Sequence, residues 1–67
     1  MSYQYDLSSI IKGNNRADNF GTQLLRLIMK ADSHNLSLLR KSFPNAVIMV
    51  EHWRESMSGE ILDLPYD

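Results

Sequence analysis

Three helix signals follow one another in residues 16–57, RADNFGTQLLRLIMKADSHNLSLLRKSFPNAVIMVEHWRESM. The first signal is a row of apolar residues whose spacing matches one face of an α-helix: Ala17, Phe20, Leu24, Leu27, Ile28 and Ala31. We predict a helix near 16–31 with this row facing inward. Gly21 costs about 1 kcal/mol relative to alanine inside a helix. Either another part of the chain approaches closely there, or the helix starts later, near Asn19.

The second signal predicts a helix near 33–43. Asp32 or Ser33 can cap its first turn, because a short polar side chain accepts from the free backbone amides there. Its apolar face comprises Leu36, Leu39 and Phe43. The helix ends before Pro44, since the residue preceding a proline is pushed out of the helical region.

The third signal predicts a helix near 44–57, which Pro44 begins because proline suits the first turn. The inward row comprises Ala46, Val47, Val50, Trp53 and Met57, widened by Ile48 and Met49. Trp53 is expected at the centre of the core, since its indole ring buries a large apolar area.

The residues before these helices form a less regular signal. Residues 6–13, DLSSIIKG, predict a short helical turn in which Asp6 accepts from the first amides and Gly13 takes the left-handed position that ends it. A strand is the alternative, because three apolar residues alternate with polar ones: Tyr3, Tyr5 and Leu7. Asn14-Asn15 marks the turn that follows and a cap for the next helix.

The C-terminal tail, residues 59–67, is GEILDLPYD, and Pro65 makes it extended. It can dock on a partner as an acidic peptide or pack back on its own helices. We favour packing, because a chain of 67 residues can rarely leave four large apolar side chains outside its core.

These signals predict an all-α single domain: a small three-helix bundle with a short N-terminal helical turn and an extended C-terminal tail. A chain of this size buries only about 60% of the surface that its unfolded form exposes, so its core is marginal. The chain has no cysteine, which excludes disulfides, and its two histidines are too few for a zinc site. Self-association as a dimer is one way to gain the missing stability.

The net charge of −1 conceals a division along the chain. Residues 12–41 hold six basic and two acidic residues, and residues 51–67 hold five acidic residues and one arginine. A basic middle and an acidic end can bind an anionic partner, pair head to tail with a second copy, or fold back on each other. An uneven solvated surface is the simplest alternative.

No set of residues predicts an active site. His34 and His52 have serines nearby, but no third group is placed to orient either ring as a catalytic base. The three glycines are not clustered, which excludes the familiar phosphate-binding loops. A helical domain this small also leaves little room for a ligand pocket of about 300–1,000 Å³. We therefore predict no enzyme activity, no cofactor and no small-molecule substrate.

The leading hypothesis is a non-enzymatic protein–protein interaction module that binds another protein or a second copy of itself. The candidate contact residues are the basic face and two residues of the tail: Arg26, Lys30, Arg40, Lys41, Leu64 and Tyr66. The alternative is a helix-turn-helix-like DNA-binding regulator that uses residues 33–57. Against it, Asn45 is the only obvious base-reading side chain at the start of the presumed recognition helix, and the sequence pI is about 6.0.

No stretch reaches the roughly 20 apolar residues that span a bilayer, and the first residues lack the basic start and apolar run of a signal peptide. We therefore expect a cytoplasmic protein without membrane contact. Four stretches, 23–32, 35–36, 43–44 and 50–54, carry a helix-packing pattern that is shared with other small proteins, and the similarity extends over about two-thirds of the chain. In them the chain resembles small uncharacterised proteins carried by bacterial phages and mobile elements. The resemblance brings no catalytic or binding residue and implies binding to a host or element protein, or to DNA.

Overall fold

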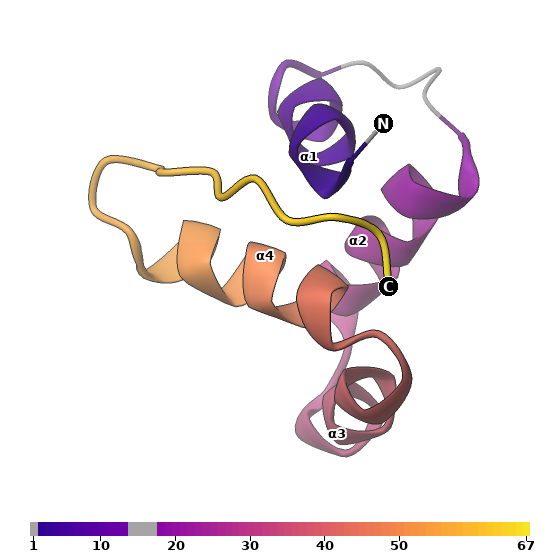
Figure 1. Cartoon of the computed structure of the whole chain (residues 1–67). Coiled ribbons are helices and arrows are strands. Elements are labelled where there is room, and N and C mark those ends of the chain that lie inside the picture. Colours follow the sequence, from indigo (N-terminus) through magenta and orange to yellow (C-terminus); the bar gives the residue numbers. More distant parts are fainter. Residues whose placement is uncertain (1, 14–17) are drawn as a thin grey trace.

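The computed structural model describes residues 2–13 and 18–67, and these residues form four helices and no strand (Figure 1). The helices are α1 (Tyr3–Ile11), α2 (Phe20–Lys30), α3 (Ser33–Ser42) and α4 (Pro44–Glu55). The all-α prediction is confirmed, whereas the prediction of a three-helix bundle with an N-terminal turn is wrong in detail. The turn is a nine-residue helix, because its apolar face has α2 and α4 to pack against.

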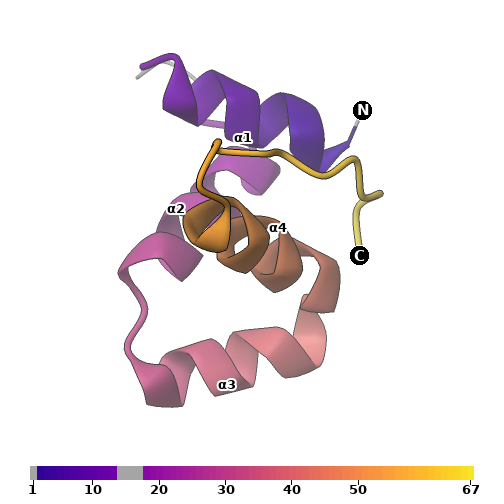
Figure 2. The ribbon, with the colours of Figure 1, turned by 90° about the vertical axis from the view of Figure 1, so that its left-hand side faces the viewer.

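Helix α4 lies in the middle of the molecule (Figure 2). Helices α1 and α2 pack on each other and on α4, and α3 packs on α4 from the opposite side. The core is built from α1, α2 and α4 and comprises Tyr3, Leu7, Leu24, Leu25, Ile28, Ala46, Val47, Met49 and Val50. Helix α3 contributes no fully buried residue, and it packs on the edge of the core through the partly buried Leu36 and Leu39.

Helix α2 starts at Phe20 rather than near residue 16, with Asn19 in the N-cap position. Asn14, Asn15, Arg16 and Ala17, which the sequence assigned to a turn and the helix start, lie outside the described residues. The buried face comprises Gly21, Thr22, Leu24, Leu25 and Ile28. The prediction that Phe20 and Leu27 face inward is therefore wrong.

The rotation of α2 follows from its contact with α1. Asp6 was predicted to cap the first turn of a helix, but it lies inside α1 and is fully buried. Its carboxylate accepts from the side-chain amide of Asn19 at 3.0 Å and from the Tyr66 hydroxyl at 2.7 Å. A Cβ atom at Gly21 would overlap this carboxylate. The glycine face of α2 therefore turns toward α1 and carries Phe20 and Leu27 outward.

Two start signals of the later helices are confirmed. Asp32 caps α3 by accepting from the backbone amide of Asn35 at 2.8 Å, and Pro44 is the first residue of α4. Trp53 is only half-buried, and Met57 lies exposed beyond the helix. Both were predicted to face the core, but α4 ends at Glu55 and Trp53 lies at the edge of the core. Met49 is the fully buried large side chain of this helix.

The tail packs back along α1 and α4 (Figure 1). The carbonyl of Leu64 accepts from the Tyr3 amide at 3.3 Å. The Asp67 carboxylate accepts from the backbone amides of Asn45 at 2.7 Å and Ala46 at 3.1 Å. It also accepts from the Tyr3 hydroxyl at 2.7 Å. Asp67 thus supplies the N-terminal cap that Phe43, in the cap position of α4, does not provide.

Candidate protein-binding groove

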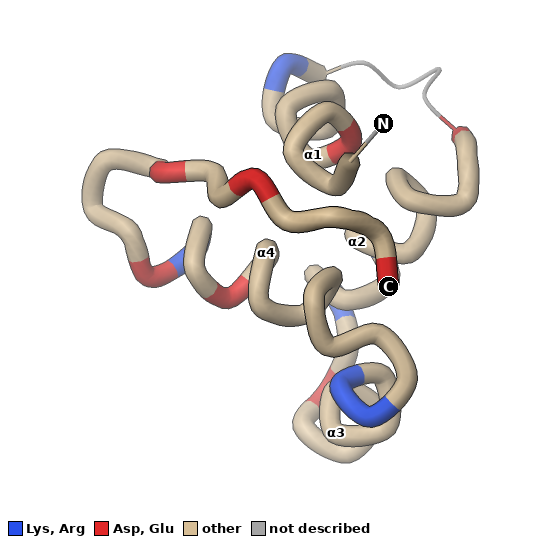
Figure 3. Tube along the Cα trace, viewed as in Figure 1, with Lys and Arg blue, Asp and Glu red and all other residues tan. Residues whose placement is uncertain are grey.

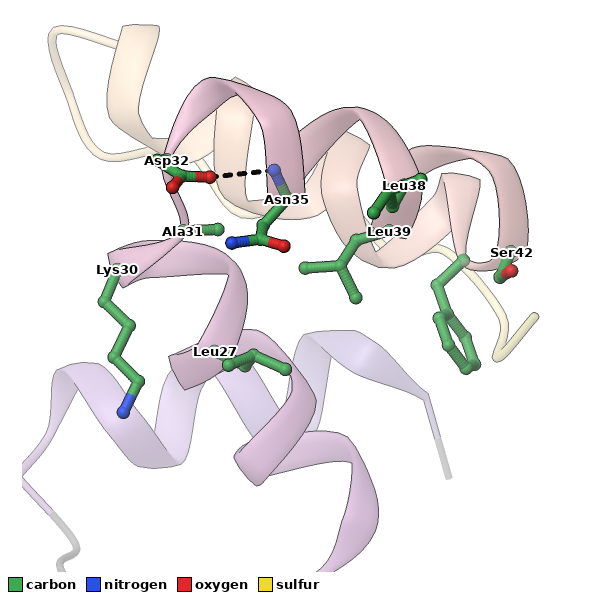
Figure 4. Close-up of a pocket in the computed structure, with 9 residues that line it drawn as sticks. Leu27, Lys30, Ala31, Asp32, Asn35, Leu38, Leu39 and Ser42 are labelled. Carbon is green, nitrogen blue, oxygen red and sulfur yellow. Dashed lines mark hydrogen bonds between the residues drawn. The ribbon is translucent and has the colours of Figure 1, made fainter.

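An apolar groove separates α2 from α3. Ala31 and Asp32 link the two helices. Beyond this link the helices flank two adjoining hollows, open to solvent, of about 610 and about 890 Å³. Leu27 of α2 and Leu39 of α3 point toward each other across the first hollow (Figure 4). Both hollows are lined by Leu27, Lys30, Leu39 and Phe43. The hollows differ from the water-excluding pocket that the sequence argument considered, since they are open to solvent where α3 packs on α4.

Large apolar side chains line the groove and remain in water. Phe20 is 71% exposed, Leu27 46% and Leu38 49%. The ring of Phe20 is tilted against that of Phe43, with centroids 5.9 Å apart, so the far end of the groove has an aromatic wall. Burying each of these side chains would stabilise a complex by roughly 1.5–3 kcal/mol, before the costs of association are subtracted. Clustered exposure of this kind is typical of an interaction surface.

The charged side chains of the groove are mainly basic. Arg26 and Lys30 stand four residues apart on the α2 wall, hence on one side of that helix. Asp32 is the acidic residue of the lining, and one of its carboxylate oxygens already accepts from the amide of Asn35. The groove therefore presents a net positive edge along α2.

The other two basic candidates lie elsewhere. The guanidinium of Arg40 makes two hydrogen bonds of 2.7 Å to the Glu51 carboxylate on α4. These bonds lower the pKa of Glu51 and raise that of Arg40. Lys41, in the last turn of α3, is exposed and is not part of the groove lining. Arg40 therefore joins α3 to α4, and reversing its charge would place two acids together there.

The tail candidates serve the fold. Leu64 is half-buried against the core. The Tyr66 ring meets that of Tyr3 edge to face at 4.8 Å. The hydrogen bond from the Tyr66 hydroxyl to Asp6 raises the pKa of Tyr66 to about 12, with a further contribution from desolvation. The six predicted contact residues thus fall into three places, of which the groove holds Arg26 and Lys30.

Acidic residues follow one another along the tail, while the basic residues at the end of α3 lie on a different element (Figure 3). Arg40 of the basic middle of the chain forms an ion pair with Glu51 of the acidic end. Within the acidic block, His52 contacts the Glu60 carboxylate at 2.6 Å. The tail is held mainly by apolar contacts and by hydrogen bonds to α1 and α4, rather than by pairing with the basic middle of the chain.

The groove residues Phe20, Leu27 and Leu38 were not among the sequence candidates. Leu38 carried a usable signal, since it is a large apolar residue that falls outside the predicted apolar face of its helix. Phe20 and Leu27 carried none, because they fit the apolar row that the spacing assigned to the core.

In the part of the chain that the structure describes, no three His, Asp or Glu side chains lie close enough together to hold a metal ion. Nor does any helix in that part combine the length and apolar character needed to cross a bilayer. Comparison with known proteins gives no relative: no protein-family model matches, and no curated protein or solved structure shows significant similarity.

Proposed function

We propose that this protein is a non-enzymatic protein-binding module whose ligand docks in the groove between α2 and α3. The observation that carries the proposal is the exposure of Phe20, Leu27 and Leu38 on the walls of one groove. A domain with a marginal core gains stability from every apolar side chain that it buries. Leaving these three in water is a cost that binding a partner would offset.

DNA binding through residues 33–57 receives less support from the geometry. A recognition helix needs a free N-terminal turn that can reach base edges. The first amides of α4 are taken by the Asp67 carboxylate, and the Asn45 side chain donates to the Pro65 carbonyl at 3.2 Å. Ala46 and Val47 are fully buried. An acidic side chain at this helix end also repels phosphate.

The resemblance to small phage and mobile-element proteins remains a prediction, and it agrees with a small adaptor that binds a host or element protein in the cytoplasm. A second copy of the chain is the alternative occupant of the groove. Two copies related by a two-fold axis would bury the same face on each protomer.

The proposal is tested by selecting from a displayed library of random peptides with three forms of the protein. Peptides are selected for binding to the wild type. Their binding to Leu38→Asp and to Ile48→Asp is then measured. Leu38 and Ile48 are matched, since each lies on a helix and they are 49% and 42% exposed. Leu38 lines the groove, whereas Ile48 on α4 does not.

We expect peptides that bind the wild type and Ile48→Asp but not Leu38→Asp, with both variants keeping the wild-type circular dichroism spectrum. Peptides that bind all three forms equally, or no enriched peptide at all, would contradict the proposal. A parallel titration with a mixed-sequence DNA duplex at about 50 and 200 mM salt tests the alternative, since phosphate contacts weaken steeply over this range.

A further inference from the structure

We infer that two copies of this chain associate by exchanging residues 60–67 of the tail, so that each tail docks on α1 and α4 of the other copy. The inference goes beyond the proposed function, because no residue of the tail lines either hollow of the groove. Three features carry it: the contacts that hold the tail, the small turn that joins the tail to α4, and an apolar side chain left in water at that turn.

The tail is held by parts of the chain that lie far from its point of attachment. It leaves α4 at the C-terminal end of that helix, whereas the Asp67 carboxylate caps the opposite end through the amides of Asn45 and Ala46. The Leu64 carbonyl and the Tyr66 hydroxyl bind α1. Because these contacts are non-covalent and use surfaces that every copy presents, the tail of a second copy would form the same set.

The turn between α4 and the exchanged segment, residues 56–59, is held by local hydrogen bonds. The amide of Gly59 donates to the Ser56 carbonyl at 3.2 Å, and the amide of Glu60 donates to the Ser56 hydroxyl at 2.9 Å. Gly59 has φ of 72°, a left-handed conformation that suits the reversal of the chain here. Opening this hinge turn would lose these bonds and regain the contacts of the tail on the other copy, so exchange is a low-cost route to a dimer.

Met57, in the hinge turn, is an apolar side chain that the closed monomer leaves in water, with an exposure of 106%. It follows the half-buried Trp53 by four residues and so continues the apolar row of α4. The helix ends at Glu55, and the chain then reverses to bring the tail to its own α1. An exchanged dimer does not need this reversal. One further turn of α4 would then place Met57 beside Trp53 on the same helix face.

Cross-linking of single-cysteine chains tests the exchange directly, because the protein has no cysteine of its own. The Ser2 hydroxyl donates to the Asp63 carboxylate of the tail at 3.2 Å, so thiols at these two positions lie close together when a tail is docked. Full-length Ser2→Cys and Asp63→Cys chains are mixed at high concentration, incubated in the reduced state and then oxidised. In the control mixture Lys41→Cys replaces Ser2→Cys, since Lys41 is exposed on α3, on the side of α4 away from α1 (Figure 2).

A single-cysteine chain cannot close a disulfide on itself, so every disulfide joins two copies. Mass spectrometry separates the mixed disulfide from the two symmetric ones. We expect the mixture of Ser2→Cys and Asp63→Cys to yield at least about tenfold more mixed disulfide than the control mixture, because a docked tail holds its two thiols at a high effective concentration. Equal yields in the two mixtures would overturn the exchange.

The hinge turn gives a second test, the dimer association constant measured by sedimentation equilibrium. Gly59→Ala and Gly13→Ala are matched, since both glycines have positive φ, 72° and 80°, and a Cβ atom at either meets nothing closer than 3.7 Å. Alanine strains the backbone at both positions, but only Gly59 lies in the hinge turn. Because each exchanged dimer opens two hinge turns, Gly59→Ala should raise the association constant at least about tenfold, and Gly13→Ala should leave it unchanged.

The same association constant for Gly59→Ala and Gly13→Ala would contradict the exchange. A wild-type dimer that Leu38→Asp dissociates and that Gly59→Ala leaves unchanged would place self-association in the groove, and would likewise overturn the inference.

Discussion

Replacing Asp67 by alanine should destabilise the domain far more than replacing Asp63, another exposed acidic residue of the same tail. The Asp67 carboxylate caps α4 through the amides of Asn45 and Ala46 and also accepts from the Tyr3 hydroxyl. Losing a helix cap costs roughly 0.5–2 kcal/mol. Leaving the hydroxyl of the buried Tyr3 without its acceptor costs roughly 1–3 kcal/mol. Because Asp67 is exposed, water replaces part of both contacts.

We therefore expect a loss of about 2 kcal/mol, near the lower end of these ranges. A 67-residue domain has a free energy of unfolding of roughly 3–10 kcal/mol at typical values per residue. With a urea m-value of about 1 kcal/mol/M, the unfolding midpoint should fall by about 2 M. The measurement is urea unfolding followed by helical circular dichroism and by Trp53 fluorescence, which should give coincident curves.

Asp63→Ala is the matched control, since it removes the same charge from the same tail. Asp63 is exposed and accepts from the Ser2 hydroxyl at 3.2 Å, so its loss should cost less than about 0.5 kcal/mol. Asp67→Asn should keep most of the cap, because asparagine and aspartate serve about equally well at a helix start. Equal midpoints for Asp67→Ala and Asp63→Ala would refute the long-range cap.

Three further predictions concern the core and its polar contacts. Gly21→Ala should destabilise the domain by about 1–3 kcal/mol despite the higher helix propensity of alanine, because its Cβ atom overlaps the Asp6 carboxylate; thermal unfolding checks this. Met49→Ala should cost about 2–5 kcal/mol and Trp53→Ala about 2 kcal/mol, since Met49 is fully buried and Trp53 half-buried. A lower urea midpoint for Trp53→Ala than for Met49→Ala would contradict the assigned core. The pKa of Tyr66 rises from 10.0 to about 12 on folding, so its contribution to stability is complete below about pH 10 and is lost as pH approaches 12; Tyr66→Phe should flatten the decline of the urea midpoint over this interval.

Local signals in the sequence were enough to locate most helix ends. Asp32 caps α3 and Pro44 begins α4, because both act through backbone geometry within a few residues. The packing of the tail could also be predicted, because a short chain can leave few large apolar residues outside its core. Gly13, with φ of 80°, ends α1 in the left-handed conformation that its position suggested.

The rotation of α2 was beyond sequence reasoning. Its apolar residues fit one helical row, and that row places Phe20 and Leu27 inside. The observed face is selected by a tertiary contact, the approach of the Asp6 carboxylate to Gly21, between residues 15 positions apart. A buried acid inside α1 has no local signature, because its partners Asn19 and Tyr66 come from other parts of the chain.

The groove was missed for the same reason. It exists because α2 turns two apolar residues outward and because α3 packs on α4 rather than on α2. Both facts concern the relative placement of helices. The basic pair Arg26 and Lys30 was found from the charge pattern, since its spacing of four keeps it on one helix face wherever that face points.

The most direct test of the α2/α3 groove as a binding surface is an amide-resolved NMR titration of the whole protein with a peptide selected from the displayed library. We expect saturable shifts in α2 from Phe20 to Lys30 and along α3, with little change in α1 and in residues 59–67. Shifts concentrated on α1 or the tail, or an unchanged spectrum, would contradict the assignment of the α2/α3 groove as the binding surface.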